Sequence, residues 1–454
     1  MALAFLIAGC AVQTAAPRPS QSPNATGEQT ATPRPTNAAD DVVYLRLNDG
    51  PTAAIVALDA RTGDVLRKLS DGAVSADGRS VYWTDFASGD TRTIVHVADL
   101  ATGKELRSFT IDGYLRPAGN PEMFNPLAGD GRLTPDGRHL ALMNSPYKTN
   151  DEWIIKLAVV GTESGALEAS TELRGQSTYN FLTFAPDGRT LFLEQYGEGA
   201  TRTRGFDVAS GKLFDLAGDG LVTTGFRTAA VLSPDGRTMY RFDAGRQTTN
   251  CTSTDGPTCV PNAVPPSVVA LDLIGRRATI LRLPNAQQSD DFEKYMLWSL
   301  TMTPDGATLY AANPALGVID EVDARQLSLR RTAPITVARG RDDLLAAIGR
   351  AVFPVADAKR YLVGGAMLSP DGRTLYAAGH DGVAVIDTAT LTSRAIWQRA
   401  HQFDTLRLTT DGRRLYAMDN MAARLVIVDT ASGASLGDIK LRYVPAILRI
   451  DAGR

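Results

Sequence analysis

Short apolar segments alternate with tight polar turns along the chain, from residue 42 to its end. Seven of the turns read Pro-Asp-Gly-Arg or a close variant, and a short apolar and aromatic run follows each one. Glycine accepts positive φ without steric cost, and aspartate bonds its own backbone, so each copy predicts a hairpin between two paired strands. The seven copies occupy residues 76–79, 135–138, 186–189, 234–237, 304–307, 370–373 and 410–413.

A second hairpin signal follows most copies: an apolar strand, an aspartate, two residues, then Ser/Thr-Gly and another strand. Clear cases surround Thr62-Gly63, Thr102-Gly103, Ser210-Gly211 and Ser432-Gly433, and weaker ones surround Ser164-Gly165, Ile274-Gly275, Ala324-Arg325 and Ala389-Thr390. These eight second hairpins exceed the seven first hairpins because the earliest, at 56–69, follows only the strand 42–47. Residues 446–454 look like the inner strand and turn of another copy, so we expect them to pair with 42–47.

Two hairpins in series make a four-stranded meander, and successive copies lie 40 to 70 residues apart, which suits propeller blades with variable insertions. Residues 41–454 therefore predict an all-β single propeller with eight blades by strand count, seven being the alternative. One strand from the C-terminus and three from the N-terminus would complete the first blade and leave no exposed sheet edge. Motif and period resemble the bacterial YVTN and WD40-like β-propeller repeats. That resemblance implies the fold and says little about chemistry.

The first nine residues are almost wholly apolar and lead into Ile7-Ala8-Gly9-Cys10. This resembles a bacterial lipobox, and the resemblance implies a diacylglycerol on Cys10 and removal of the segment before it. Residues 11–40 are rich in Pro, Thr and Ala and have little to bury, which predicts a disordered tether. We therefore expect a signal remnant and lipobox at 1–10, a tether at 11–40, and an extracytoplasmic protein anchored to a bacterial membrane.

Two further features bear on compartment and partners. Cys251 and Cys259 flank a turn-forming Asp-Gly-Pro, which predicts a loop disulfide suited to an oxidising compartment, with two unpaired surface thiols as the alternative. Lysine and arginine total 47 against 50 for aspartate and glutamate, a net charge of −3, without a clustered basic stripe. We therefore expect no nucleic-acid partner.

In a four-stranded meander both tight turns lie on one face, so the longer connections must emerge on the opposite face. Those connections are residues 111–128, 144–152, 244–264, 284–295 and 335–362. Long loops on one side of a rigid ring favour recognition, and we place ligand binding there. The candidate residues in and beside these connections are Tyr114, Arg116, Tyr147, Trp153, Tyr295, Trp298 and Phe353. They suit a protein, peptide or glycan ligand, unless most of them only seal loops onto the blades.

Candidate catalytic groups are few. Of four histidines, His380 and His401 fall near the long-loop face in neighbouring blades, as an acid–base or metal pair. The sequence holds no nucleophile elbow, phosphate-binding glycine loop or haem-attachment motif. The repeated aspartates read as turn formers, and we expect neither a metal nor a cofactor. The favoured function is a binding or scaffolding propeller; the alternative is an enzyme of the lactonase or quinone-dependent dehydrogenase type.

Overall fold

The strands form where apolar and polar positions alternate, and they build one compact unit within residues 35–454. The computed structural model describes residues 40–47, 53–86, 91–118, 131–196, 201–218, 222–223, 227–244, 246–252, 258–284, 294, 297–336, 365–419, 421–442 and 445–452. Side chains are not described at 222–223, 227, 246–252, 258–264 and 445. The expected lipobox and tether, at 1–10 and 11–40, lie outside these ranges except for Asp40.

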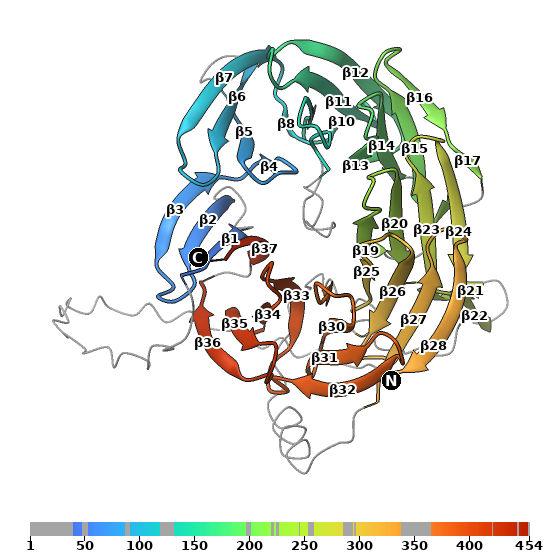
Figure 1. Cartoon of the computed structure of the whole chain (residues 1–454). Helices are drawn as coiled ribbons and strands as arrows, with labels where there is room; N and C mark the ends of the chain where they lie inside the picture. Colours follow the sequence, from blue (N-terminus) through green and yellow to red (C-terminus); the bar gives the residue numbers. More distant parts are fainter. Residues whose placement is uncertain are drawn as a thin grey trace, which may run out of the picture. The chain divides into compact units, whose positions relative to one another are not determined.

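Eight four-stranded sheets stand around a common axis in the described chain (Figure 1). The strands of each blade are given from the innermost outward. Blade 1 has β37 (Pro445–Asp451), β1 (Val42–Leu47), β2 (Ala54–Asp59) and β3 (Val65–Ser70), and blade 2 has β4 (Ala73–Val74), β5 (Ser80–Phe86), β6 (Arg92–Asp99) and β7 (Glu105–Asp112). Blade 3 has β8 (Arg116–Pro117), β9 (His139–Met143), β11 (Glu152–Gly161) and β12 (Leu167–Gly175), and blade 4 has β13 (Thr178–Phe184), β14 (Thr190–Tyr196), β15 (Thr201–Asp207) and β16 (Lys212–Asp215).

Blades 5 to 8 follow in the same order. Blade 5 has β19 (Arg227–Leu232), β20 (Thr238–Asp243), β23 (Ser267–Asp272) and β24 (Arg277–Arg282), and blade 6 has β25 (Ser299–Met302), β26 (Thr308–Asn313), β27 (Val318–Asp323) and β28 (Ser328–Pro334). Blade 7 has β29 (Ala366–Leu368), β30 (Thr374–Gly379), β31 (Gly382–Asp387) and β32 (Thr392–Trp397), and blade 8 has β33 (Phe403–Leu408), β34 (Arg414–Asp419), β35 (Arg424–Asp429) and β36 (Ser435–Lys440). The prediction of eight blades is confirmed, and the seven-bladed alternative is wrong.

The ring closes as the sequence predicts. Strand β37 pairs antiparallel with β1, from Leu47 opposite Pro445 to Val42 opposite Asp451, so the two ends of the sequence complete blade 1 (Figure 1). Asp41, which is fully buried just before β1, adds a polar clasp to blade 8. Its carboxylate accepts hydrogen bonds from Arg414 Nε at 2.7 Å and from Tyr416 Oη at 2.6 Å.

The Asp-Gly turns join the first and second strands of the blades, and their aspartates hold the turns. In blade 8 the Asp411 carboxylate accepts hydrogen bonds from Thr409 Oγ1 at 2.6 Å and from the Arg413 amide at 3.0 Å. These bonds lower the pKa of Asp411 below its ordinary value. Gly412 follows with a φ of 71°, a left-handed conformation that glycine adopts without strain. The interpretation of these aspartates as turn formers fits this geometry.

The Ser/Thr-Gly turns join the third and fourth strands. In blade 8 the Asp429 carboxylate accepts hydrogen bonds from the Ser432 amide and hydroxyl, and Gly433 has a φ of 73°. This glycine also meets the neighbouring blade, because a Cβ placed on it would lie 2.4 Å from the Trp397 ring. The turn glycine is therefore needed for close blade contact as well as for chain reversal.

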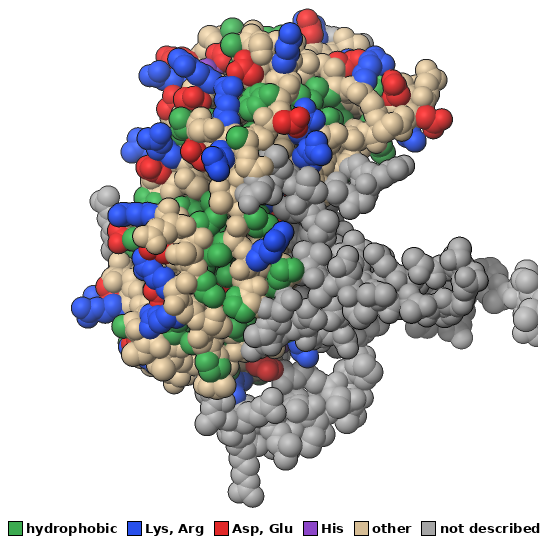
Figure 2. All heavy atoms as spheres, turned by 90° about the vertical axis from the view of Figure 1, so that its right-hand side faces the viewer, with side chains coloured by type: hydrophobic (Ala, Val, Ile, Leu, Met, Phe, Trp, Pro, Cys, Tyr) green, Lys and Arg blue, Asp and Glu red, His purple; other side chains and the backbone are tan. Residues whose placement is uncertain are grey.

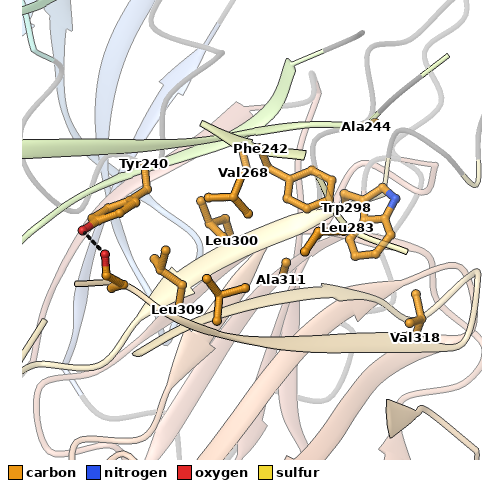
Figure 3. Packing of buried hydrophobic residues seen from close by; sticks show 13 residues of the cluster. Tyr240, Phe242, Ala244, Val268, Leu283, Trp298, Leu300, Leu309, Ala311 and Val318 are labelled. Carbon is orange, nitrogen blue, oxygen red and sulfur yellow. Dashed lines mark hydrogen bonds between the residues drawn. The ribbon is translucent and has the colours of Figure 1, made fainter. Parts of the chain in front are cut away.

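The hydrophobic core lies between the faces of neighbouring blades. Between blades 5 and 6, Phe242 stacks on Trp298 with ring centroids 4.5 Å apart, above Leu300 and Leu309 (Figure 3). Tyr240 belongs to the same cluster, and its hydroxyl donates a 2.9 Å hydrogen bond to the Ala324 carbonyl of blade 6 (Figure 3). Burial of apolar surface between blades is the main source of stability in such a ring.

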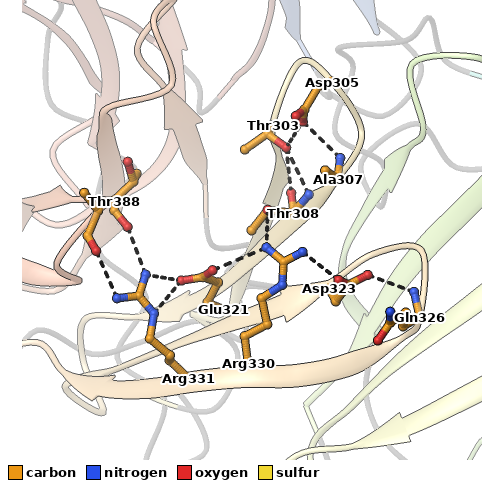
Figure 4. Close-up of polar contacts among 11 residues, drawn as sticks. Thr303, Asp305, Ala307, Thr308, Glu321, Asp323, Gln326, Arg330, Arg331 and Thr388 are labelled. Carbon is orange, nitrogen blue, oxygen red and sulfur yellow. Dashed lines mark hydrogen bonds and ion pairs between the residues drawn. The ribbon is translucent and has the colours of Figure 1, made fainter.

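The outer rim adds ionic links between blades. In blade 6, Arg331 pairs with Glu321 and donates a 2.9 Å hydrogen bond to the Ala389 carbonyl of blade 7 (Figure 4). Its neighbour Arg330 binds Asp323 at 2.6 Å within blade 6. Over the side of the molecule in Figure 2, basic and acidic side chains are interspersed rather than segregated.

Two predicted long connections contain strands of their own. Residues 144–152 include β10 (Tyr147–Thr149), which pairs with the start of β11, and residues 244–264 form the hairpin of β21 (Arg246–Thr252) and β22 (Thr258–Val264). Two other short strands pair at blade margins: β17 (Ala217–Gly218) with β24, and β18 (Val222–Thr223) with β15. The two long connections thus contain paired backbone that satisfies its own hydrogen bonds, which the sequence analysis did not predict.

Candidate functional site

Strand order places the two kinds of connection on opposite faces of the ring. In blades 2 to 8 the innermost strand runs from the face of the longer connections to an Asp-Gly turn, and the second strand returns; in blade 1 the antiparallel pair of β37 and β1 has the same directions. The longer segments after the second and fourth strands therefore share one face, as the sequence predicts. We call it the long-loop face.

An exposed aromatic and cationic patch lies on this face between blades 2 and 3. Phe86, the last residue of β5, packs edge to face with Tyr114 at 5.5 Å between ring centroids. The Arg116 guanidinium lies over the same Phe86 ring, with its carbon 5.4 Å from the centroid. Tyr114 is 54% exposed and Arg116 is also exposed. We call these three residues the aromatic patch; two of them were sequence candidates, and Phe86 was missed.

The other aromatic candidates occupy different environments. Tyr147 lies on β10 of blade 3 and is 47% exposed, whereas Trp153 on β11 is half-buried against that blade's core. Trp298 is a core residue, 3% exposed and stacked on Phe242, and its place in the core serves blade packing rather than the surface. Tyr295 and Phe353 lie outside the described residues.

Where blade 8 reaches the long-loop face, it carries a histidine and two aspartates, which are His401, Asp404 and Asp419. His401 Nδ1 lies 2.7 Å from Asp419 Oδ2, and the His401 ring stacks on Phe403. Asp419 is 3% and Asp404 is 5% exposed. Asp404 occupies a β-bulge, where the register of β33 against β34 shifts between Phe403 and Thr405. Bulges of this kind re-aim a side chain next to functional sites.

Burial sets the protonation of this cluster. Desolvation raises the pKa of Asp404 to about 8, and the negative charge of Asp419 adds to the rise. Oδ1 of Asp404 has no hydrogen-bond partner among the described residues. Asp404 is therefore mostly protonated at neutral pH, on the same blade as a histidine that a second carboxylate holds. A protonated carboxyl is able to donate a proton.

The second histidine candidate, His380, lies in the hairpin turn between β30 and β31 of blade 7. Its Nε2 atom is buried, with no hydrogen-bond partner in the described part of the chain. The two candidate histidines thus belong to neighbouring blades on the expected face, and within the described residues His401 is the one of the two that contacts a carboxylate, that of Asp419.

Three buried arginines line the inner part of the ring. Arg46 Nη2 of blade 1 and Arg132 Nη2 of blade 3 donate to the same oxygen, the Gly72 carbonyl of blade 2, at 2.6 and 2.7 Å. Arg407 lies on β33, the innermost strand of blade 8, and is 6% exposed. None of the three was predicted from the sequence, nor were Asp404 and Asp419.

Two of these residues, Arg132 and Arg407, can be recognised by comparing equivalent positions in the repeats. Arg132 and Arg407 both precede their turn aspartate by four residues, where other copies have Ala73, Val231 or Met367. A charged residue at a position that is uncharged in most of the repeats indicates a role other than packing.

Metal and cofactor positions were also considered. Within the described ranges, no group of three or more His, Cys, Asp or Glu side chains is placed to hold a metal ion. The described residues likewise include no helix long and apolar enough to cross a bilayer. The prediction of no cofactor stays a prediction.

The three cysteines are only partly placed. Cys10 lies outside the described residues. Cys251 on β21 stands directly opposite Cys259 on β22 in the hairpin register. Opposed residues in antiparallel strands have Cα atoms about 4.5 to 5.5 Å apart, within the range that a disulfide spans. The register therefore permits the expected bridge, which stays a prediction.

No family model and no curated protein matches this chain. Among solved structures, dihydro-heme d1 dehydrogenase NirN in complex with DHE aligns over 93% of this chain and 78% of its own, at 14% identity and a TM-score of 0.51. Apo AztD from Citrobacter koseri aligns over 92% and 99% at 12% identity, TM-score 0.45. The periplasmic gluconolactonase PpgL of Pseudomonas aeruginosa aligns over 82% and 99% at 17% identity, TM-score 0.39. The first alignment supports the β-propeller fold and carries no information on ligand or reaction.

Proposed function

We propose that this protein is an extracytoplasmic binding module that holds a protein or peptide partner on its long-loop face. The aromatic patch of Phe86, Tyr114 and Arg116 is the observation that carries the proposal. Tyrosine and arginine dominate the energetically important residues of protein interfaces. Here both side chains pack on the Phe86 ring, which restrains them before a partner arrives and lowers the entropy lost on binding.

The site lies on a rigid part of the ring. Phe86 is the last residue of β5. Arg116 is the first residue of β8 and stands opposite Met143 on β9. Tyr147 is exposed on the same blade and extends the surface on which a partner would rest. The net charge of −3, from 47 basic and 50 acidic residues, argues against a partner chosen by long-range attraction alone. Contacts at the aromatic patch must then supply the specificity.

The binding test uses the full chain with Cys10→Ser, so that lipidation does not confound capture. We expect this chain to retain a partner from an envelope extract, identifiable by mass spectrometry, and to bind the purified partner. Tyr114→Ala together with Arg116→Ala should weaken that binding at least tenfold. Leu106→Ala, on an exposed outer-strand residue, is the control and should leave it unchanged. Equal binding by both variants contradicts the proposal, and binding of a glycan array in place of any protein would favour a glycan partner.

The cellular location belongs to the same proposal. A diacylglycerol on Cys10 would anchor the mature chain, and residues 11–40 would hold the propeller away from the membrane surface. The opposed Cys251 and Cys259 support an oxidising compartment. Fractionation of the native and Cys10→Ser chains tests the anchor, because only the native chain should sediment with membranes.

The cluster of His401, Asp419 and Asp404 favours a second candidate function, an acid–base enzyme such as a lactonase. Asp419 orients His401 through Nδ1, and the protonated Asp404 carboxyl is a potential proton donor. An assay for lactone hydrolysis should then show activity that His401→Ala lowers by at least a hundredfold. The His380→Ala variant is the comparison. Lack of hydrolysis by the native chain over a panel of lactones argues against this candidate and leaves the binding module.

A further inference from the structure

A buried arginine on β33 has no explanation in the fold. Arg407 stands four residues before the turn aspartate Asp411. At the same position the other blades have mostly small, apolar or hydroxyl side chains, namely Ala73, Arg132, Thr183, Val231, Thr301, Met367 and Ile447. Innermost strands of this ring therefore form without a charge at this position, so the guanidinium of Arg407 has a different purpose.

The hydrogen bonds of Arg407 leave one edge of its guanidinium unpaired within the described part of the chain. Nη1 donates to the Leu406 carbonyl oxygen at 2.7 Å. Nε and Nη2 have no partner among the described residues, although both atoms are buried. These two nitrogens form the edge that presents parallel N–H groups to the two oxygens of a carboxylate or phosphate. The edge suited to bidentate oxyanion binding is thus the one that the described protein leaves unused.

Arg132 is an internal comparison, because it occupies the equivalent position in blade 3. Its exposure of 4% is similar to that of Arg407. Arg132 reaches the Gly72 carbonyl, which Arg46 also binds, and so links blades 1, 2 and 3. Arg407 makes no such link to a neighbouring blade within the described chain. An arginine at this position can therefore serve as an interblade tie, and Arg407 does not.

Among the described residues, no ion pair compensates the charge of Arg407. Desolvation lowers its pKa to about 10, so the guanidinium stays charged at neutral pH. Asp404, on the same strand, has a pKa of about 8 and is mostly uncharged there. A buried charge without a counter-charge strongly destabilises a fold. An anion bound at the unpaired edge would remove that penalty.

We propose that Arg407 binds an oxyanion, the carboxylate or phosphate group of a small ligand, through Nε and Nη2 at the inner edge of blade 8. This site is separate from the aromatic patch, and its existence does not depend on the proposed partner. The ligand carries its negative group toward β33, where a bidentate contact fixes its orientation. Carboxylates and phosphates share this geometry, and the experiment distinguishes them.

The test measures thermal unfolding of the full chain in inorganic phosphate, in succinate, and in sodium chloride at equal ionic strength. We expect phosphate or succinate to raise the melting temperature in a concentration-dependent way that chloride does not reproduce, because a ligand that binds only the native state stabilises it. The anion that raises the melting temperature at the lower concentration, phosphate or succinate, identifies the chemical group that the site prefers. Isothermal titration with that anion then gives its dissociation constant.

Two variants assign the effect to Arg407. Arg407→Lys keeps the charge but loses the paired N–H groups, and should bind the anion at least tenfold more weakly; Arg407→Met should not respond. The control Arg330→Lys, on the outer rim, should respond as the native chain does. The proposal is overturned if neither anion exceeds chloride, or if Arg407→Lys keeps the native affinity. Should Arg407→Met fail to fold, the lysine variant decides alone.

Discussion

Asp404 and Asp411 are chemically identical carboxyls a few residues apart, yet their surroundings shift their pKa values in opposite directions. Asp404 is buried in a bulge of β33, and desolvation raises its pKa to about 8. Asp411 accepts hydrogen bonds from Thr409 and from the Arg413 amide, and these lower its pKa. The local supply of donors, rather than the residue type, decides whether the charged form is favoured.

A pH prediction follows for Asp404. A carboxyl whose folded pKa lies above its unfolded value of about 3.9 destabilises the fold increasingly as the pH rises from about 4 to 8. Asp404→Asn removes that loss. We expect this variant to melt at a higher temperature than the native chain at pH 8, with the difference shrinking toward pH 4.

The matched control is Asp411→Asn, for which the sign reverses. Because the pKa of Asp411 is lowered, its ionised form stabilises the fold above about pH 4, and this stabilisation is lost as the pH falls through the folded pKa. Asp411→Asn should therefore be less stable than the native chain at pH 7, with the gap closing at low pH. Melting curves between pH 3 and pH 8 check both variants. A pH-independent difference for Asp404→Asn would refute a neutral, buried Asp404.

At the scale of the blade, the Ser/Thr-Gly turn contributes to chain reversal and, in some blades, to packing against the next blade. Blades 4 and 8 share the pattern Asp-x-x-Ser-Gly, ending at Gly211 and Gly433, and both glycines have positive φ, 67° and 73°. A Cβ on Gly433 would meet the Trp397 ring of blade 7 at 2.4 Å, whereas a Cβ on Gly211 would meet nothing within 4 Å. The same local motif thus serves chain reversal in one blade, and reversal plus blade packing in the other.

This pair separates backbone strain from blade packing. Gly211→Ala should cost about 1 to 2 kcal/mol of unfolding free energy, the strain of a left-handed alanine. Gly433→Ala should cost a further ~1 to 3 kcal/mol, because Trp397 must move to admit the methyl group. Urea unfolding of the two variants measures the difference. Equal losses would mean that blades 7 and 8 adjust freely at this contact.

At the scale of the whole molecule, closure joins groups that are far apart in the chain. Asp41 pairs with Arg414 and Tyr416, which lie 373 and 375 positions away in the sequence. Arg414 is 15% exposed, and Asp41 is not exposed at all. The Tyr416 pKa is raised, chiefly by burial and then by its hydrogen bond to Asp41. This clasp and the β37–β1 pairing together hold blade 8 against blade 1.

Loss of the clasp should therefore weaken the whole ring. Asp41→Asn leaves the Arg414 charge without its counter-charge, and we expect a loss of about 3 to 5 kcal/mol in unfolding free energy. The control Asp438→Asn breaks a pair with Arg424 whose side chains are 34% and 43% exposed, and should cost less than about 1 kcal/mol. Urea unfolding tests both. Similar losses in the two variants would show that closure rests on β37 alone.

The sequence by itself determined the architecture, because the signals that build a blade are local. Asp-Gly and Ser/Thr-Gly turns impose hairpins whatever lies around them, and an inner strand left over at residues 446–454 must find the incomplete sheet at 42–47. The count of eight blades, the closure and the face of the longer connections followed from these rules. The candidate binding residues Tyr114 and Arg116 could also be predicted from the sequence, because aromatic and cationic side chains are easily recognised in a connection between strands.

Only the tertiary structure decided how individual side chains are used. Trp298 is a residue type common in binding sites, but it is buried and stacks on Phe242 of blade 5. Asp404 and Arg407 look like ordinary polar residues of a strand until the fold buries them and leaves some of their polar atoms without partners among the described residues. Burial and protonation depend on groups brought together from distant parts of the chain, so no local pattern encodes them.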